Sequence, residues 1–317
     1  MLAVKKMLFD TRKSVTEKYT LTLPSQEQAL VYIKRDDLID EWVSGNKWRK
    51  LKYNIEQANK LSKEGILTFG GAFSNHLLAT AKACDKAGLE SVGVVRGEEL
   101  SANSNPTLKN CSALGMKLIF ISRSEYKNRN DYAYLAQWKD TYNSLYVVPE
   151  GGANFYGVVG CQEIIAETTN DFDHVFVAAG TGTTAAGVLT SISAKTKVHV
   201  VETLKGDFLK KNIETHVNQV YNNEKLTKDI LENCTFIADR FGGYAKWNKE
   251  LVDFVQFFHR ETGVKLDLIY TGKVLYAWMQ KVMNGEIHGD DKVLFIHSGG
   301  LQGMSEINKK IGFQLYN

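Results

Sequence analysis

The sequence predicts an α/β protein with two parallel sheets. Short apolar strands alternate with amphipathic helical segments along most of the 317 residues. Strands such as residues 66–69 and 175–179 are continuous apolar runs, and no hairpin signal joins neighbouring strands. Such runs are typical of parallel strands that helices cover on both faces. The chain also exceeds the usual length of a single core, so we expect two domains or one large unit.

The first half of the chain has a regular order of elements. Up to about residue 30 the sequence looks irregular. A strand at 31–34 precedes a helix that starts at Lys47 and that Gly65 should close. Further strands are expected at 66–69, 91–95, 117–121 and 145–148, with helices between them that start near Ser74 and Pro106. The Gly-Gly segment at 149–154 is the clearest break, and we place a domain boundary there.

The alternation resumes beyond this break. A helix is expected at 157–168, and residues 204–233 are charged and predicted to be helical with loops. The remaining expected elements are strands at 175–179, 198–201, 266–270 and 292–297, and helices at 247–258 and 271–283. The second half therefore repeats the architecture of the first without repeating its sequence.

Composition and charge exclude several classes of protein. Hydrophobic residues make up 44% of the chain, charged residues 24%, and the net charge is +3, so no basic surface for nucleic acid is expected. The cysteines lie far apart without a C-x-x-C pair, which argues against disulfides and a zinc site. No apolar run approaches the roughly 20 residues of a membrane helix. We expect a cytoplasmic protein without a metal, a signal peptide or a membrane partner.

Two lysines at the start of the first long helix attract attention. Apolar residues at Trp48, Leu51 and Ile55 define one helix face, and Lys47 and Lys50, three residues apart, share another. The helix dipole disfavours a cation at this end. A lysine held there is explained by a lowered pKa, which suits a nucleophilic amine, with an anion near Lys50. The alternative is a solvated basic helix start.

Glycine-rich loops follow several strands, at 70–75, 150–154, 180–187 and 298–300. Such loops lie at the carboxyl edge of parallel sheets, where ligands bind. Residues 180–187, Gly-Thr-Gly-Thr-Thr-Ala-Ala-Gly, predict an anion cradle of backbone N–H groups and threonine hydroxyls. The loop is neither a Walker A motif nor G-x-G-x-x-G. A dinucleotide site stays possible because Glu202 lies about 20 residues further on, and a purely structural turn is the alternative.

Other polar residues at turns and at the ends of elements have a structural interpretation, and Ser74 also has a functional one. Ser74 is a natural helix cap, or else a hydroxyl that contacts a substrate carboxylate, with Asn75 beside it. Tyr244 and Tyr270 lie on turns, where tyrosines are usually amphipathic fillers. His297 is read as structural because no nucleophile–acid arrangement accompanies it.

Together these motifs resemble the fold-type II pyridoxal-phosphate enzymes. They are similar in particular to the family of 1-aminocyclopropane-1-carboxylate deaminase and D-cysteine desulfhydrase. Its hallmark Gly-Asn-Lys-x-Arg-Lys matches residues 45–50, and Gly-Gly-x-x-Ser-Asn, Glu-Gly-Gly, the Gly/Thr loop and His-Ser-Gly-Gly follow in order. The resemblance extends from about residue 31 to residue 300.

The resemblance implies roles for individual residues. Lys47 would bind the cofactor pyridoxal 5′-phosphate covalently and move protons, and Ser74 would meet the carboxylate of a small amino-acid substrate. Tyr270 would line the cofactor face as a candidate acid/base. The cofactor-binding set would be Lys47, Lys50, Asn75, Gly180, Thr181, Gly182, Thr183, Thr184, Tyr244, Thr271 and Ser298. In this set Asn75 would bind the ring 3-hydroxyl, and Lys50 with the backbone of 180–184 would bind the phosphate.

One departure from the family concerns the reaction. Deaminases proper carry a glutamate after the tyrosine equivalent to Tyr270, facing the pyridine nitrogen, whereas this chain and the desulfhydrases have a threonine, here Thr271. A neutral hydroxyl at Thr271 or Ser298 supports a weaker electron sink than a carboxylate does. We therefore expect β-elimination from D-cysteine to pyruvate, ammonia and sulfide. The alternatives are deamination of 1-aminocyclopropane-1-carboxylate, a nicotinamide-dependent oxidoreductase that uses Glu202, and a non-catalytic protein that binds a phosphate ligand.

The resemblance also implies an organisation. A larger cofactor domain would comprise residues 1–51 plus 150–317, and a smaller domain, 52–149, would be inserted into it. Both would be three-layer α/β/α units with a parallel sheet, and the active site would lie in the cleft between them. The protein would be a homodimer.

Overall fold

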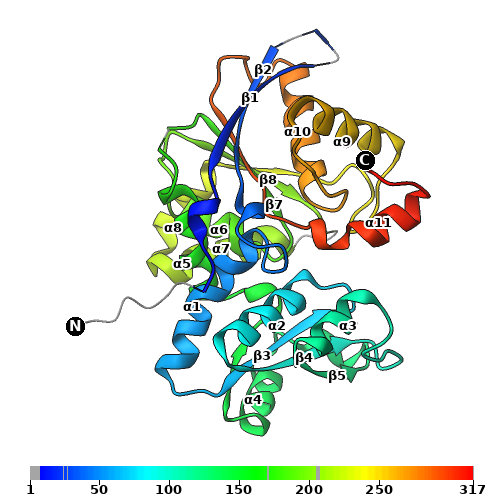
Figure 1. Ribbon diagram of the computed structural model, residues 1–317. Helices are drawn as coiled ribbons and strands as arrows, with labels where there is room; N and C mark the ends of the chain where they lie inside the picture. Colours follow the sequence, from blue (N-terminus) through cyan, green and yellow to red (C-terminus); the bar gives the residue numbers. More distant parts are fainter. Residues whose placement is uncertain (1–7, 24, 27, 170, 205–207, 317) are drawn as a thin grey trace.

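The computed structural model describes residues 8–23, 25–26, 28–169, 171–204 and 208–316, and it contains two β-sheets (Figure 1). The larger sheet has the strand order β1-β2-β10-β7-β8-β9. Its strands are β1 (Thr16–Thr22), β2 (Gln28–Lys34), β7 (His174–Ala179), β8 (Lys197–Glu202), β9 (Cys234–Ile237) and β10 (Val293–Ile296). The smaller sheet has the order β5-β4-β3-β6, formed by β3 (Gly65–Gly71), β4 (Glu90–Arg96), β5 (Lys117–Ile121) and β6 (Leu145–Val148).

Helices cover both faces of each sheet, as expected for continuous apolar strands. They are α1 (Asn46–Lys60), α2 (Asn75–Ala87), α3 (Pro106–Ala113), α4 (Tyr132–Thr141), α5 (Phe155–Ala166), α6 (Thr183–Leu189), α7 (Phe208–Tyr221), α8 (Glu224–Glu232), α9 (Lys249–Thr262), α10 (Thr271–Met283) and α11 (Met304–Ile311). Alternate residues of β7 enter different cores: Phe176 packs with α9 and α10, whereas Val177 packs with α5, α6 and α7. This three-layer α/β/α arrangement confirms the predicted fold class.

The smaller sheet is built in the same way. Ile66 packs with α1 and α2, while Leu67 on the opposite face packs with the aromatic side of α4. All pairings in this sheet are parallel. Figure 1 shows it with its helices below the larger sheet, and α1 lies at the junction. All its strands come from residues 65–148, inside the range 52–149 that we assigned to an inserted domain; the division itself stays a prediction.

The prediction that the chain is irregular before residue 30 is wrong. Residues 16–22 form β1, which pairs antiparallel with β2 in the register Thr16↔Lys34 to Thr22↔Gln28 and adds a hairpin at the sheet edge. Only Leu21 of this strand is buried. The strand is therefore stabilised mainly by its backbone pairing, and it lacks the apolar run that predicted the other strands.

Two further expectations are wrong in detail. Gly65 does not cap α1, which ends at Lys60; it opens β3, where a Cβ would overlap with the backbone of Glu90. Residues 266–270 form no strand. The side chain of Asp267 instead accepts hydrogen bonds from the backbone N–H groups of Ile269, Tyr270 and Thr271, and this turn leads into α10. A local polar side chain thus outcompetes strand pairing.

The described residues contain neither a membrane-spanning helix nor a metal-binding cluster. No helix among them is long and apolar enough to cross a membrane. No group of three or more histidine, cysteine, aspartate or glutamate residues in the same part of the chain is arranged to hold a metal ion.

Candidate active site

The start of α1 lies against the end of β10. Gly45 has φ +64°, and a Cβ at this position would overlap with the carbonyl group of Ser298. Only glycine allows this close approach without strain. The N–H of Asn46 also points to the Ser298 carbonyl oxygen, at 3.4 Å. The lysine motif and the C-terminal His-Ser-Gly-Gly motif, about 250 residues apart, are thereby brought together.

Asn46 connects Lys47 to the Gly/Thr loop. Lys47 Nζ donates a hydrogen bond to Asn46 Oδ1 at 2.6 Å, and Asn46 Nδ2 donates to Thr184 Oγ1 at 2.7 Å. Burial of the amine, together with the nearby charge of Lys50, lowers the pKa of Lys47 to about 7. A large part of the Lys47 side chains is therefore neutral and nucleophilic at neutral pH. This excludes the solvated helix start.

The Glu-Gly-Gly segment joins the remaining motifs. A Cβ on Gly151 would lie 2.8 Å from Thr181 Cγ2. A Cβ on Gly152 would lie 2.9 Å from Lys50 Cβ and 3.5 Å from His76 Cε1. Both glycines have positive φ. This short turn between β6 and α5 therefore touches the Gly/Thr loop on one side and the second lysine on the other.

The Gly/Thr loop connects β7 to α6. The hydroxyls of Thr181 and Thr183 lie 3.0 Å apart. Gly182 has φ +87°, and its Cβ would lie 2.7 Å from Ile213 Cγ1, whereas a Cβ on Gly180 would meet nothing closer than 3.9 Å. Gly182 is thus required by the fold, and Gly180 leaves open space next to Tyr270.

Lys50 supplies positive charge close to this loop. Its side chain is buried, and burial lowers its pKa. Within the described chain its ammonium group has no hydrogen bond or ion pair, and it is not among the buried atoms that solvent does not reach. The ammonium group is therefore free to bind an anion.

Two tyrosines lie together beside Gly180. The rings of Tyr244 and Tyr270 meet edge to face, with centroids 6.2 Å apart. Burial raises the pKa of both phenols, that of Tyr270 well above its ordinary value. Each hydroxyl therefore stays protonated near neutral pH and can donate a proton, but cannot act as a base at rest.

Ser74 and Asn75 open α2 as predicted. Ser74 is the N-cap, and its Oγ accepts the N–H of Leu77 at 3.3 Å. A Cβ on Gly70 would lie 2.7 Å from Ser74 Oγ, so Gly70 makes room for the cap. Asn75 is partly exposed. The cap and the substrate contact expected of Ser74 are compatible, because a hydroxyl oxygen has two lone pairs and one proton.

Thr271 and Ser298 differ in what their hydroxyls can do. Thr271 Oγ1 donates to Asp267 Oδ2 at 2.6 Å and accepts the N–H of Asp267 at 2.8 Å. The hydroxyl proton of Thr271 is therefore already donated to Asp267 and is not available to a ligand. Among the residues that the structure describes, Ser298 Oγ has no hydrogen-bond partner. His297 contacts the backbone oxygen of Lys265 at 2.7 Å, in agreement with a structural histidine.

Asp267 is a buried carboxylate that the sequence analysis missed. It is 0% exposed, and a Cβ on Gly300 would lie 2.8 Å from its Oδ2. Its charge acts on both Lys47 and Tyr270. The only sequence signal was an acidic residue four positions before Thr271, which an expected strand concealed.

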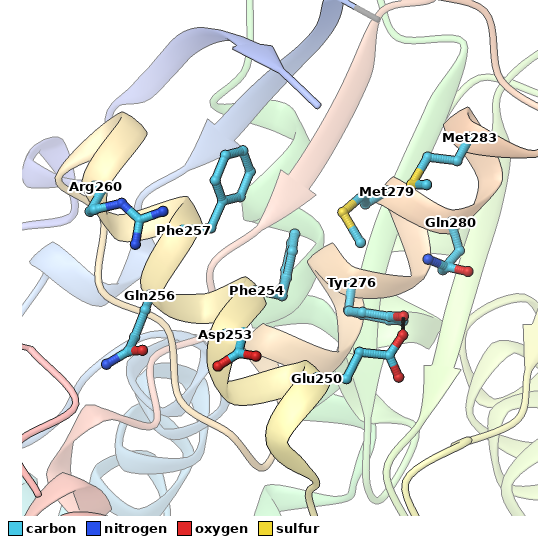
Figure 2. Close-up of a pocket in the computed structure, with 10 residues that line it drawn as sticks. All are labelled: Glu250, Asp253, Phe254, Gln256, Phe257, Arg260, Tyr276, Met279, Gln280 and Met283. Atoms are coloured by element: carbon cyan, nitrogen blue, oxygen red, sulfur yellow. Dashed lines mark hydrogen bonds between the residues drawn. The ribbon is translucent and has the colours of Figure 1, made fainter. Parts of the chain in front are cut away.

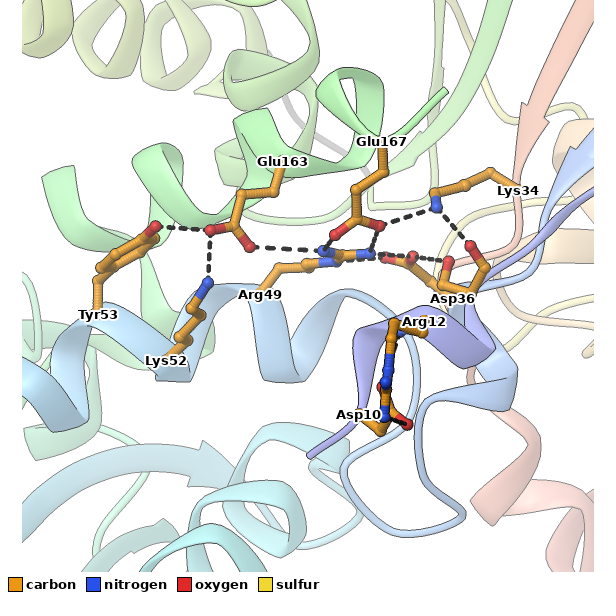
Figure 3. A network of polar contacts seen from close by, with 10 residues as sticks. Asp10, Arg12, Lys34, Asp36, Arg49, Lys52, Tyr53, Glu163 and Glu167 are labelled. Atoms are coloured by element: carbon orange, nitrogen blue, oxygen red, sulfur yellow. Dashed lines mark hydrogen bonds and ion pairs between the residues drawn. The ribbon is translucent and has the colours of Figure 1, made fainter. Parts of the chain in front are cut away.

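A polar network fixes the other side of α1 (Figure 3). The guanidinium of Arg49 is fully buried and binds Asp36 through Nη2 at 2.9 Å and Glu167 through Nη1 at 2.5 Å and Nη2 at 2.7 Å. Asp36 precedes α1, and Glu167 caps α5. Arg49 therefore ties α1, which carries both lysines, to α5 and to the segment that precedes α1.

Hollows in the described surface lie outside this cluster. A groove of about 530 Å³ separates α9 from α10 and is lined by side chains such as Phe254, Phe257 and Met279 (Figure 2). None of the residues that line it belongs to the predicted site. A second hollow, of about 470 Å³, reaches Ser44 and Leu301 beside the end of β10.

Fold and site together define an α/β protein in which a lysine of lowered pKa is connected through Asn46 to a glycine/threonine loop. Residues 15–299 match the model of the family described as "Pyridoxal-phosphate dependent enzyme". The chain belongs to this family of pyridoxal-phosphate-dependent enzymes. A pyridoxal-phosphate-dependent enzyme therefore replaces the alternative of a nicotinamide-dependent oxidoreductase that uses Glu202.

The names of similar proteins state two activities, deamination of 1-aminocyclopropane-1-carboxylate and desulfhydration of D-cysteine. The chain is 32% identical over 303 residues to a "Putative 1-aminocyclopropane-1-carboxylate deaminase" of Pyrococcus furiosus, covering 89% of this chain and 88% of the relative. It is 30% identical over 293 residues to a "D-cysteine desulfhydrase" of Serratia proteamaculans, covering 85% and 86%. It is also 30% identical to a bifunctional D-cysteine desulfhydrase/1-aminocyclopropane-1-carboxylate deaminase of Arabidopsis thaliana, covering 86% and 73%.

Solved structures show the same fold. A structure titled "Crystal Structure Analysis of the ACC deaminase homologue" matches with a TM-score of 0.77 at 26% identity, over 93% of this chain and 92% of that one. A pyridoxal 5′-phosphate-dependent aspartate racemase matches with a TM-score of 0.63 at 17% identity, covering 90% of each chain, which shows the fold alone.

The residues present fit the family cofactor. Pyridoxal phosphate supplies an aldehyde that binds an amine, an electron-accepting ring and a phosphate dianion. Lys47 is a nucleophilic amine, and Lys50 is a buried cation without a partner beside a glycine/threonine loop. The free hydroxyl of Ser298 lies at the same cluster. Each group of the cofactor thus has a matching group of the protein.

Proposed function

We propose that this enzyme eliminates the β-thiol of D-cysteine, with pyridoxal phosphate bound at Lys47. One D-cysteine and one water would give pyruvate, ammonia and hydrogen sulfide. The observation that carries the proposal is Thr271, a neutral residue at the position after Tyr270 where the deaminases proper have glutamate. The relatives named D-cysteine desulfhydrase give further support.

The lysines divide the work between chemistry and binding. Lys47 Nζ would hold the cofactor, and its neutral amine would take the proton from the substrate α-carbon. Its lowered pKa favours this role, because the neutral amine is the base. Lys50 and the backbone of Gly180, Thr181, Gly182, Thr183 and Thr184 hold the phosphate.

The remaining assignments are those that the family resemblance implies. Ser74 would orient the substrate carboxylate, and Asn75 would donate to the ring 3-hydroxyl. Tyr270 protonates the leaving sulfur, because its raised pKa keeps the phenol protonated until the thiolate departs. Tyr244 packs edge to face against Tyr270, while 46% of its own surface is exposed.

Ser298 is the better partner for the pyridine nitrogen. Its hydroxyl is free to donate, whereas the proton of Thr271 belongs to Asp267. A neutral donor at Ser298 would not hold a proton on that nitrogen as a carboxylate does, so it would support a more moderate electron sink. Elimination of a thiol needs no stronger sink, because a proton is available at the α-carbon and the leaving group departs readily.

A second function is favoured by Asp267. This carboxylate lies one hydrogen bond behind Thr271, so negative charge is present at this end of the site. Together with the relative of 32% identity named a putative 1-aminocyclopropane-1-carboxylate deaminase, it supports deamination of that substrate to 2-oxobutanoate and ammonia.

Steady-state kinetics separate the two functions. We expect kcat/KM of the holoenzyme for D-cysteine to exceed that for 1-aminocyclopropane-1-carboxylate by more than tenfold, with L-cysteine as the chirality control. Release of sulfide and of 2-oxo acid should be measured in parallel. A preference for the cyclopropane substrate would overturn the proposal. Thr271→Glu is a poor test, because it would bury a second carboxylate against Asp267.

We also propose the organisation that accompanies this function. Residues 1–51 plus 150–317 form the cofactor domain, residues 52–149 form the smaller domain, and the substrate binds in the cleft between them. The enzyme is a homodimer in the cytoplasm. The two domains meet at Gly152 of the cofactor domain, because a Cβ there would lie 3.5 Å from Cε1 of His76 in the smaller domain. Light scattering of the purified holoenzyme tests the dimer, and a monomer mass would refute it.

A further inference from the structure

His76 is a buried histidine beside the two lysines with no role assigned so far. It lies in the first turn of α2, directly after Ser74 and Asn75, and only 3% of its surface is exposed. Its Cε1 atom would lie 3.5 Å from a Cβ on Gly152, the same glycine whose Cβ would lie 2.9 Å from Lys50 Cβ and 3.6 Å from Lys50 Cδ. The imidazole of His76 and the stem of Lys50 therefore both lie against Gly152.

The hydrogen bonds of Thr68 fix the tautomer of this imidazole. Thr68 Oγ1 donates its single proton to the backbone oxygen of Val148 at 2.8 Å. It also lies 3.0 Å from His76 Nε2, and at this contact it can only accept. His76 therefore carries its proton on Nε2, and its Nδ1 has a free lone pair.

That lone pair is a buried acceptor without a donor. Nδ1 has no hydrogen-bond partner among the described residues, and water does not reach it. Burial, and next the charges of Lys50 and Lys47, lower the pKa of His76 to about 3, so the ring stays neutral. An unpaired buried acceptor costs free energy, which a lysine ammonium group nearby can remove.

We propose that His76 is a positioning residue: the ammonium group of Lys50, which makes no hydrogen bond in this structure, turns to donate one to the unpaired Nδ1 of His76. That bond would hold the cation toward the 180–184 loop and leave two of its three protons for an anion. The inference rests on the proposed function in one respect, namely that Lys50 binds the cofactor phosphate. It adds a neutral histidine that orients the cation without competing for the anion.

Two substitutions separate the two ring nitrogens. His76→Gln places an amide near the position of Nε2, keeps a partner for Thr68 and removes the acceptor at Nδ1. His76→Asn places an amide near Nδ1 and gives up the contact with Thr68. Each apoprotein should be titrated with pyridoxal 5′-phosphate and with pyridoxal, which lacks the phosphate.

We expect His76→Gln to raise the Kd for pyridoxal 5′-phosphate about tenfold, the loss typical of one hydrogen bond to a charged group, and to change the Kd for pyridoxal less than twofold. His76→Asn should bind both ligands as the wild type does. Equal losses for both ligands with His76→Gln, or a phosphate-specific loss with His76→Asn alone, would overturn the proposal. Because each comparison uses two ligands on the same protein, a general loss of stability does not imitate the expected result.

A Lys50→Met background distinguishes this inference from the proposed function. Lys50→Met should itself weaken pyridoxal 5′-phosphate but not pyridoxal, and His76→Gln should add nothing in this background. If Lys50→Met has no phosphate-specific effect, the phosphate assignment fails. If Lys50→Met has its effect and His76→Gln still adds its full loss, only the role of His76 fails. Nitrogen-15 spectra of the wild-type apoprotein give a test without a histidine variant: a proton on Nδ1 of His76 would contradict the proposal.

Discussion

Replacing Arg49 with methionine should destabilise the protein far more than removal of an exposed arginine does. The guanidinium of Arg49 and the carboxylate of Asp36 are both fully buried, and they share two contacts, at 2.9 and 3.2 Å. Methionine has a similar length but no charge. In Arg49→Met the carboxylate of Asp36 keeps the hydroxyl of Ser14 at 2.5 Å but loses its cation.

The size of the loss follows from the burial. Breaking a buried ion pair by removing one partner costs about 3–5 kcal/mol, because an uncompensated charge remains inside. Glu167 is partly exposed, so water can compensate it and it adds little. For a chain of this length about 2 °C of melting temperature is lost per kcal/mol, so Tm should fall by roughly 6–10 °C.

Thermal denaturation of the apoprotein followed by circular dichroism provides the measurement. The matched control is Arg12→Met, because Arg12 pairs with Asp10 at the exposed surface, at 2.8 Å. Water screens this pair, so its loss should leave Tm unchanged. If Arg49→Met lowers Tm by no more than Arg12→Met does, the network in Figure 3 does not stabilise the start of α1.

Three further predictions concern the site. The rate at which apoprotein binds pyridoxal should rise about tenfold per pH unit below pH 7 and level off above it, because only the neutral amine of Lys47 reacts and its pKa is about 7; a rate that still rises beyond pH 9 would contradict this. Gly180→Val should fold normally but be purified without cofactor, whereas Gly182→Val should also lose Tm, because its Cβ meets Ile213; equal stability of the two variants would refute the distinction. Tyr270→Phe should lower kcat about 10²–10⁴-fold at unchanged cofactor content, since the proton donor is removed; unchanged kcat would exclude Tyr270 as the acid.

The parts of the site that lie next to strand ends could be predicted from the sequence. The glycine loops at 70–75, 150–154, 180–187 and 298–300 follow strands of two parallel sheets, and parallel strands place such loops at one edge. The start of α1 was predicted to within one residue because its apolar positions repeat with helical spacing.

What the sequence could not provide depends on contacts between distant residues. β1 is a strand because β2 pairs with it, and its own residues are mostly exposed. Asp267 turns an apolar run into a loop by collecting the N–H groups that a strand would have offered to a neighbour. The proton of Thr271 is committed by that same carboxylate, which corrects the equal treatment of Thr271 and Ser298.

His76 shows the same limit for a site residue. Its sequence position, directly after Ser74 and Asn75, does not indicate its burial. Its burial and free Nδ1 result from Thr68 and Gly152, which belong to other elements. Periodicity within one helix contains no information on such partners.

The identity of the lysine that binds the cofactor is the most direct test of the site. The holoenzyme should be reduced with borohydride, digested and mapped by mass spectrometry. The visible absorption band should vanish on reduction, and the pyridoxyl group should be found on the peptide that contains Lys47, at Lys47 itself. A pyridoxyl group on Lys50 or on another lysine, or a visible band that persists in Lys47→Ala, would contradict the assignment of residues 45–50 as the centre of the active site.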